Sequence, residues 1–155
     1  MQMTPEQKLA ALNLTLPAAP TPAGQYRPAR LVGNLLYLSG QGPRDAEGSF
    51  RAGKLGRDVS VEEGYAAARN AGLQLLAAAK AELGDLSRVE SVVKVFGMVH
   101  AEAGFVDHAK VLNGCSELLV EVFGDAGCHT RSVAGMDSLP CGMIVEIEAI
   151  LAVKS

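Results

Sequence analysis

The C-terminal stretch MIVEIEAILAV constrains the fold more than any other segment of the chain. Every second residue from Val145 to Val153 is aliphatic, and side chains alternate across a strand, so one face must pack into a core. The opposite face carries Glu146 and Glu148 between Ile144 and Ile150. A strand with one fully apolar face and one mixed face predicts a sheet that is covered on one side only.

Two helices are predicted to supply that cover. Ser60 and Glu63 form a capping box, and helical spacing of apolar and small residues then continues until Gly84. The stripe comprises Tyr65, Ala68, Gly72, Leu75 or Leu76, Ala79 and Leu83. A second stripe, which Gly124 ends, comprises Phe105, Ala109, Leu112, Ser116, Leu119 and Phe123. Both stripes are narrow enough to pack on one sheet face.

The remaining regular segments are strands. A hairpin is predicted around Gly33 and Asn34, and VESVVKVFGMVHA at 89–101 is rich in β-branched residues. HTRSVAGM and the C-terminal stretch complete the order β-β-α-β-α-β-β. We therefore predict an α+β fold with a mixed sheet and both helices on one face.

The N-terminal part is predicted to differ from the rest. Residues 4–14 form a short helix that Thr4 and Pro5 open, and LPAAPTPAG is an irregular proline-rich connector. The chain is expected to divide into an N-terminal extension, 1–25, and a single domain, 26–155.

The uncovered sheet face predicts self-association. Leu35, Ile144 and Ile150 would leave an apolar surface in a monomer, so a homo-oligomer packed through this face is expected. Glu146 would then be partly desolvated, and Arg131 is a candidate partner. The plainer interpretation of the arginine is a structural ion pair between adjacent strands at a subunit interface, and a catalytic role is the alternative.

Composition excludes several classes of function. A net charge of -3 and few aromatic residues argue against an extended nucleic-acid surface. No signal peptide or membrane span is predicted, so a cytoplasmic location is the expectation. The three cysteines show no pairing or zinc pattern, and we expect reduced thiols. His100, His108 and His129 lack metal-ligand spacing and are interpreted as surface or satisfied residues, and the neighbours Cys128 and His129 are not expected to form a nucleophile and base.

An ordered set of motifs resembles the Rid family, also called the YjgF-like or reactive-intermediate deaminase family. The motifs are YLSGQ at 37–41, the Asn113 region, RS at 131–132, LP at 139–140 and VEIEAI at 145–150. The resemblance runs from about Tyr26 to the C-terminus. It implies a chorismate mutase-like fold and a homotrimer with sites in the clefts between subunits.

The resemblance also implies site residues. Arg131 would bind a substrate carboxylate through its planar fork, and Glu146 would position the attacking water. Further substrate-binding candidates are Tyr26, Ser39, Asn113, Ser132 and Cys141, the last through backbone groups that would hold the departing nitrogen. No cofactor and no metal are implied.

The activity that the resemblance implies is hydrolysis of enamines or imines such as 2-aminoacrylate to the 2-oxo acid and ammonia. One alternative is a small-molecule binding or regulatory trimer that senses a carboxylate metabolite without turning it over. Endoribonuclease activity, an older description of parts of the family, is disfavoured by the acidic charge balance.

Overall fold

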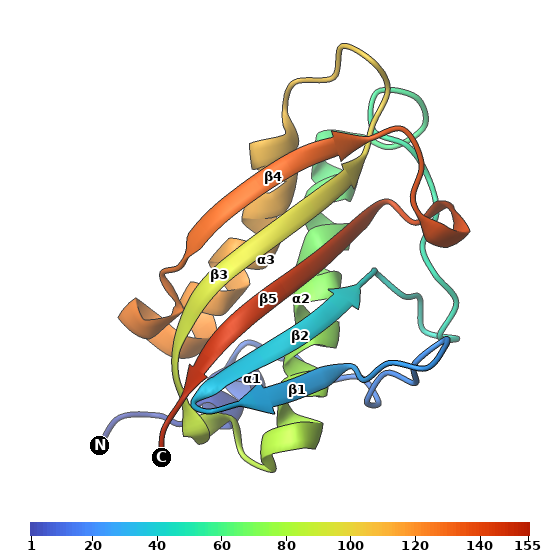
Figure 1. Cartoon of the computed structure of the whole chain (residues 1–155). Helices are drawn as coiled ribbons and strands as arrows, with labels where there is room; N and C mark the ends of the chain where they lie inside the picture. The colour runs from blue at the N-terminus through green and yellow to red at the C-terminus, as the bar shows by residue number, and fades with distance from the viewer.

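A computed structural model describes residues 1–155 (Figure 1). The elements in chain order are α1 (Pro5–Ala11), β1 (Ala29–Val32), β2 (Leu35–Gln41), α2 (Val61–Leu83), the 3-10 turn η1 (Leu86–Arg88), β3 (Val89–His100), α3 (His108–Phe123), the 3-10 turn η2 (Gly124–Gly127), β4 (Thr130–Met136), the 3-10 turn η3 (Pro140–Gly142) and β5 (Val145–Val153). The predicted β-β-α-β-α-β-β order is confirmed, and α1 is the short helix predicted within residues 4–14. No helix is both long and apolar enough to cross a bilayer.

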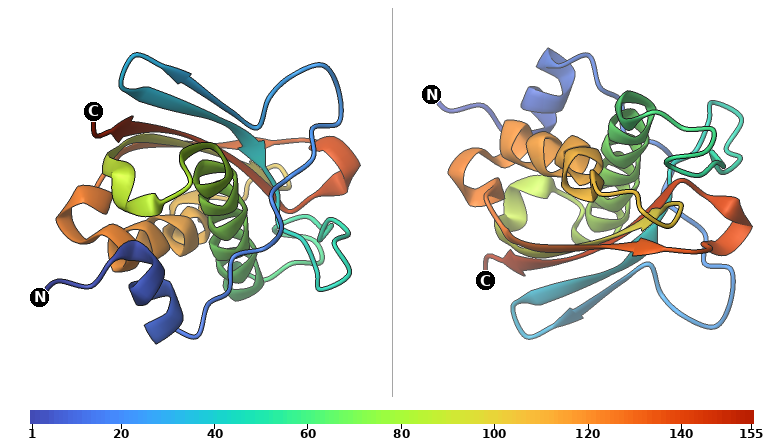
Figure 2. Two further views of the ribbon diagram at one scale, coloured as in Figure 1. Left: turned by 90° about the horizontal axis from the view of Figure 1, so that it is seen from below. Right: turned by 90° about the horizontal axis from the view of Figure 1, so that it is seen from above.

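The five strands form one mixed sheet in the order β1-β2-β5-β3-β4. The β1–β2, β2–β5 and β5–β3 pairs are antiparallel, and β3 and β4 are parallel. Seen along the sheet, α2 and α3 lie together on one face and the opposite face carries no helix (Figure 2). The prediction of an α+β fold with both helices on one face is therefore confirmed.

Local signals located both ends of α2 correctly. The Ser60 hydroxyl accepts from the Glu63 N–H, and the Glu63 carboxylate accepts from the Ser60 N–H, as the predicted capping box requires. Gly84 ends α2 with a φ of 83°, a conformation that favours glycine. The second predicted stripe began too early, because α3 starts at His108 and Phe105 lies in the loop before it, edge-on to the His108 ring.

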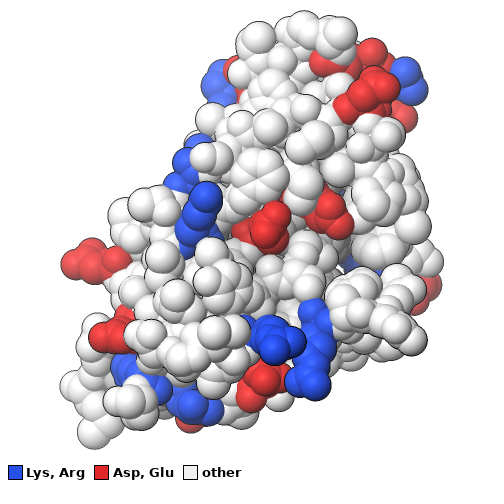
Figure 3. All heavy atoms as spheres, in the orientation of Figure 1, with Lys and Arg blue, Asp and Glu red and all other residues white.

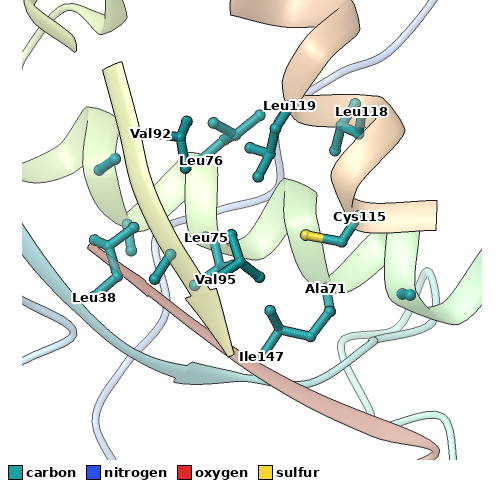
Figure 4. Packing of buried hydrophobic residues seen from close by; sticks show 14 of the residues in the cluster. Leu38, Ala71, Leu75, Leu76, Val92, Val95, Cys115, Leu118, Leu119 and Ile147 are labelled. Carbon is teal, nitrogen blue, oxygen red and sulfur yellow. The ribbon is translucent and has the colours of Figure 1, made fainter. Parts of the chain in front are cut away.

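The core lies between the helices and the covered sheet face. Its members on β5 are the residues that the alternation predicted, Val145, Ile147, Ala149, Leu151 and Val153. Leucines of both helices and Cys115 meet these strands from above (Figure 4). Each fully buried leucine or valine of this kind contributes about 1.5–3 kcal/mol through removal of apolar surface from water.

Ile144 is an exception to the predicted alternation. We expected it on the open face, but its side chain is only 4% exposed and belongs to the core. The residue precedes β5, and its backbone bonds to Arg51 and His100 rather than to a regular strand partner. The glycine-rich loop at 43–58 therefore covers Ile144 and removes it from the open surface.

The N-terminal segment packs onto the body of the fold. Leu9 of α1 is buried in the common core, and Leu14 and Leu16 lie against it. The Glu6 carboxylate accepts from the Leu86 N–H at 2.8 Å. Helix α1 therefore shares its apolar contacts with the domain that it precedes.

The order of the last strands corrects one expectation. We treated the strands of Arg131 and the two glutamates as adjacent, but β3 lies between β4 and β5. The parallel crossover through α3 places β4 beside β3, while the antiparallel β5 fills the position between β3 and β2. Arg131 and the two glutamates therefore do not lie on adjacent strands of one chain, and an ion pair between them at a subunit interface stays a prediction.

Candidate functional site

Arg131 faces the helices from the edge strand β4. Its partner in the sheet register is Val95, a fully buried residue of the covered face. The guanidinium Nη1 donates to Asn113 Oδ1 at 2.8 Å and to Ser116 Oγ at 3.1 Å, both on α3. None of the five ion pairs of the chain includes Arg131. Its positive charge therefore meets only neutral acceptors within the chain.

A histidine continues this network. Ser116 Oγ lies 2.9 Å from His129 Nε2, and His129 Nδ1 lies 2.7 Å from the Gly127 carbonyl oxygen. These side chains and Arg131 are half-buried. Arg131, Asn113, Ser116 and His129 are called the arginine cluster below.

A second group of polar residues lies on the open face of the sheet. Leu38 pairs with Ala149 and Gln41 with Ile147, so Ser39 and Gly40 together stand opposite Glu148. This bulge is where the YLSGQ motif departs from regular pairing. Glu146 lies against it: a Cβ placed on Gly40 would come within 3.0 Å of the Glu146 Cγ and Cδ atoms. The glycine thus leaves room for the carboxylate.

A depression of about 590 Å³ adjoins this group, and Tyr26, Tyr37, Ser39 and Glu148 contribute to its wall. Ser39 Oγ donates to the Arg27 carbonyl at 2.6 Å, which ties β2 to the segment before β1. Ser39, Glu146, Glu148 and Tyr26 are called the open-face cluster below. Figure 3 views this face: uncharged atoms cover most of it, and acidic groups lie near its centre.

Burial and like charge act together on Glu146. Partial burial is the larger cause that raises the pKa of Glu146, and the negative charge of Glu148 on the same face raises this pKa further. Neither carboxylate takes part in an ion pair. A carboxyl group with a raised pKa keeps its proton at a higher pH than an ordinary glutamate does.

The cysteines fall into two environments. Cys115 is fully buried between α2 and α3, and burial raises the pKa of this thiol to about 12, against a smaller opposite effect of Arg131. Cys128 and Cys141 are exposed, and all three are free thiols as predicted. Cys141 has a φ of 57° in the turn η3, so backbone rather than side-chain geometry distinguishes it.

The structure brings the predicted site residues into two separate places. Arg131 and Asn113 lie in the arginine cluster, and Glu146, Ser39 and Tyr26 lie on the open face. Ser132 alternates away from Arg131 onto the open face, and Cys141 lies in the loop before β5. β4 and β5 lie two strand spacings, about 10 Å, apart. Arg131 and Glu146 also point to opposite faces of the sheet, so the two clusters do not converge within one chain.

Sequence reasoning missed Ser116 and His129 as members of the site. Ser116 lies three residues after Asn113 on a helix, and His129 lies two residues before Arg131 in an extended segment. Both spacings place side chains on a common face. The interpretation of His129 as a satisfied residue is confirmed, but its link through Ser116 to Arg131 was not predicted.

Comparisons with known proteins agree on one family for this chain. A family model described as "YjgF/chorismate mutase-like, putative endoribonuclease" matches residues 6–150. Protein TCP17 of Trypanosoma cruzi is 39% identical over 148 residues, which are 95% of this chain and 92% of that protein.

Two solved structures illustrate the range of similarity. One from Shewanella oneidensis MR-1, described as a "putative endoribonuclease", is 35% identical to this chain with a TM-score of 0.94. The match covers 97% of this chain and 100% of the other. RidA from the Antarctic bacterium Psychrobacter sp. PAMC 21119 is 29% identical with a TM-score of 0.61, covering 87% of this chain and 94% of the other.

Proposed function

Because the chain belongs to the YjgF/chorismate mutase-like family, we propose that it hydrolyses small reactive enamines and imines that carry a carboxylate. The substrate would be of the 2-aminoacrylate kind, and the products would be a 2-oxo acid and ammonia. Water adds to the imine carbon, and the resulting carbinolamine loses ammonia as its C–N bond breaks. The similarity to a RidA structure supports this reaction class.

The observation that carries the proposal is the uncompensated charge of Arg131. Only Nη1 donates hydrogen bonds to residues of α3. Nε and Nη2 form the other edge of the guanidinium, and that edge matches the two oxygens of a carboxylate side-on. Neutral acceptors at Nη1 orient the group without cancelling the charge that would attract the substrate.

Glu146 is proposed to handle the proton. With its pKa raised, the carboxylate can accept a proton from the attacking water and return it to the departing nitrogen. Backbone groups near Cys141 are proposed to bind that nitrogen, and Ser39 and Tyr26 to line the site. Because the substrate is already reactive, orientation can provide much of the rate increase.

A homotrimer is proposed because the two clusters need a second copy to meet. The edge strand β4 carries Arg131, whereas the open face of a neighbouring subunit would supply Glu146. Exposed apolar groups on or beside that face, including Tyr37 and Val93, favour its burial. Sedimentation should show a trimer at micromolar concentration, and a stable monomer would contradict the shared-cleft site.

The activity is tested with 2-aminoacrylate produced in the cuvette by a pyridoxal-phosphate-dependent lyase. Formation of the 2-oxo acid in the presence of this protein should exceed the uncatalysed rate and should scale with its concentration. A trimer that binds 2-oxobutanoate but gives no acceleration would instead favour the regulatory, non-catalytic alternative.

Endoribonuclease activity is the second candidate, because the matching family description names it. The net charge of -3 and an aromatic content of 5% oppose an RNA-binding surface. Incubation with single-stranded RNA should leave the RNA intact. Cleavage that Glu146→Gln abolishes would favour the second candidate.

A further inference from the structure

The donor and acceptor roles in the arginine cluster follow from two distances. The Gly127 carbonyl oxygen only accepts, so His129 Nδ1, at 2.7 Å, carries a proton. In the neutral ring Nε2 is then the unprotonated nitrogen, and the Ser116 hydroxyl donates to it. The Ser116 oxygen keeps its lone pairs for Arg131, whose Nη1 donates at 3.1 Å.

The hydrogen bonds that run from the Gly127 carbonyl through His129 and Ser116 to Arg131 are called the relay below. The fold holds the Gly127 end of the relay rigidly. Gly127 is buried, and a Cβ at this position would lie 2.2 Å from the Leu119 carbonyl oxygen of α3. The turn η2 is thus packed directly against the helix that carries Ser116. Because the Gly127 carbonyl cannot move independently, it fixes the orientation of the imidazole that it accepts from.

Without the histidine, the serine would have another partner. A serine within a helix commonly turns its hydroxyl to the carbonyl four residues earlier, here that of Leu112. His129 draws the hydroxyl away from the helix backbone, and its oxygen then faces Arg131. The contact at Ser116 complements the one at Asn113, so two acceptors define the plane of the guanidinium.

From this geometry we infer that His129 is a positioning residue, which acts through Ser116 to hold the Arg131 guanidinium with its Nε and Nη2 edge free for a carboxylate. The inference rests on the proposed function for its consequence, the binding of a substrate carboxylate. The relay itself is independent of turnover. Preorganisation of this kind strengthens binding because less side-chain freedom is lost when the ligand arrives.

The experiment follows the side chain of Arg131 by ¹H–¹⁵N NMR of the full-length protein. The Nε and Nη signals of Arg131 are assigned by their disappearance in Arg131→Lys. His129→Leu removes both ring nitrogens, and Ser116→Ala removes the relay from its other side, so the test survives if one variant does not fold. His129→Gln is the matched control, because its amide oxygen can accept from Ser116 at about the position of Nε2.

In the wild type, restricted rotation should give Arg131 Nη signals distinct from those of an exposed arginine such as Arg57. His129→Leu and Ser116→Ala should both shift these signals toward the exposed position, and His129→Gln should restore them. Affinity for 2-oxobutanoate should fall roughly three- to tenfold in the first two variants, the range expected for one lost hydrogen bond. The fall in kcat/KM should appear mainly as a higher KM, with kcat nearly unchanged.

Three results would overturn the inference. One is an Arg131 signal that is identical in the wild type, His129→Leu and Ser116→Ala. Another is a drop in melting temperature that His129→Gln reverses without restoring the Arg131 signal, which would indicate a structural role only. The third is loss of turnover in Ser116→Ala with unchanged 2-oxobutanoate binding, which would make Ser116 a nucleophile paired with His129. If the wild type neither binds 2-oxobutanoate nor accelerates hydrolysis, the proposed function fails, while the NMR comparison still decides the relay.

Discussion

Replacement of Arg131 separates a binding role from a structural one. Arg131→Ala removes the contact proposed for the substrate carboxylate, and truncation of one partner of such a pair typically costs about 2–5 kcal/mol. At 1.36 kcal/mol per factor of ten, kcat/KM should fall roughly 30- to 5000-fold. Arg131→Lys keeps the charge but loses the fork, so a smaller fall of roughly 10- to 100-fold is expected.

The expected loss of stability is smaller. Arg131→Ala removes two hydrogen bonds to half-buried neutral acceptors, Asn113 Oδ1 and Ser116 Oγ, which water can reach after truncation. At about 0.5–1.5 kcal/mol each, the free energy of unfolding should fall by about 1–3 kcal/mol. For a chain of 155 residues this corresponds to a melting temperature lower by about 3–10 °C.

Three measurements on the wild type and the two variants test this reasoning: thermal unfolding, sedimentation, and hydrolysis of 2-aminoacrylate. Arg57→Ala is the control, because Arg57 is largely exposed and belongs to neither cluster. Its guanidinium forms an ion pair with Glu102 at 2.7 Å. If Arg131→Ala dissociates the assembly while hydrolysis per remaining oligomer is unchanged, the binding role is refuted. The interpretation of Arg131 as part of a structural ion pair at a subunit interface would then be favoured.

Three further predictions follow from individual side chains. The Cys115 thiol, with a pKa of about 12, is ionised only to about one part in 10⁴ at pH 8. Iodoacetamide should therefore modify Cys128 and Cys141 but leave Cys115 unlabelled until the protein is denatured, and peptide mass spectrometry measures the labelling. Gly40→Ala places a methyl group 3.0 Å from the Glu146 side chain and should reduce kcat on the order of tenfold with little change in melting temperature; unchanged kinetics would argue against a role for that carboxylate. The raised pKa of Glu146 means that the folded state binds its proton more tightly, so its contribution to stability declines as pH rises through the folded pKa; Glu146→Gln should therefore gain stability relative to the wild type between pH 4 and pH 8, and denaturant titrations at both pH values measure the difference.

Signals within a few residues of one another were enough for the helices and for the covered face of β5. The Ser60–Glu63 capping box and Gly84 defined α2, because caps depend on neighbouring backbone groups. Alternation along β5 identified its buried residues, because the pleat fixes which side chains share a face. The same rule failed at Ile144, which lies before the regular pairing begins.

The composition of the candidate site followed from the sequence only in part. The motifs of a known family pointed to Arg131, Asn113 and Glu146, and alternation placed Glu146 on the open face, but neither signal showed that Arg131 lies on the opposite face. His129 looked isolated because its partners, Ser116 and the Gly127 carbonyl, come from a helix and a turn rather than from a recognisable motif.

The sequence by itself determined the elements and the side of each strand that enters the core, and it pointed to Arg131 as the candidate for binding a carboxylate. Only the tertiary structure decided that β3 separates β4 from β5, and that the pairing register places Arg131 and Glu146 on opposite faces of the sheet. The physical reason is that periodicity acts over a few residues, whereas strand order depends on which distant segments bury the most surface together. A pattern along the chain can fix which way a side chain points from its strand, but not which strand lies beside it.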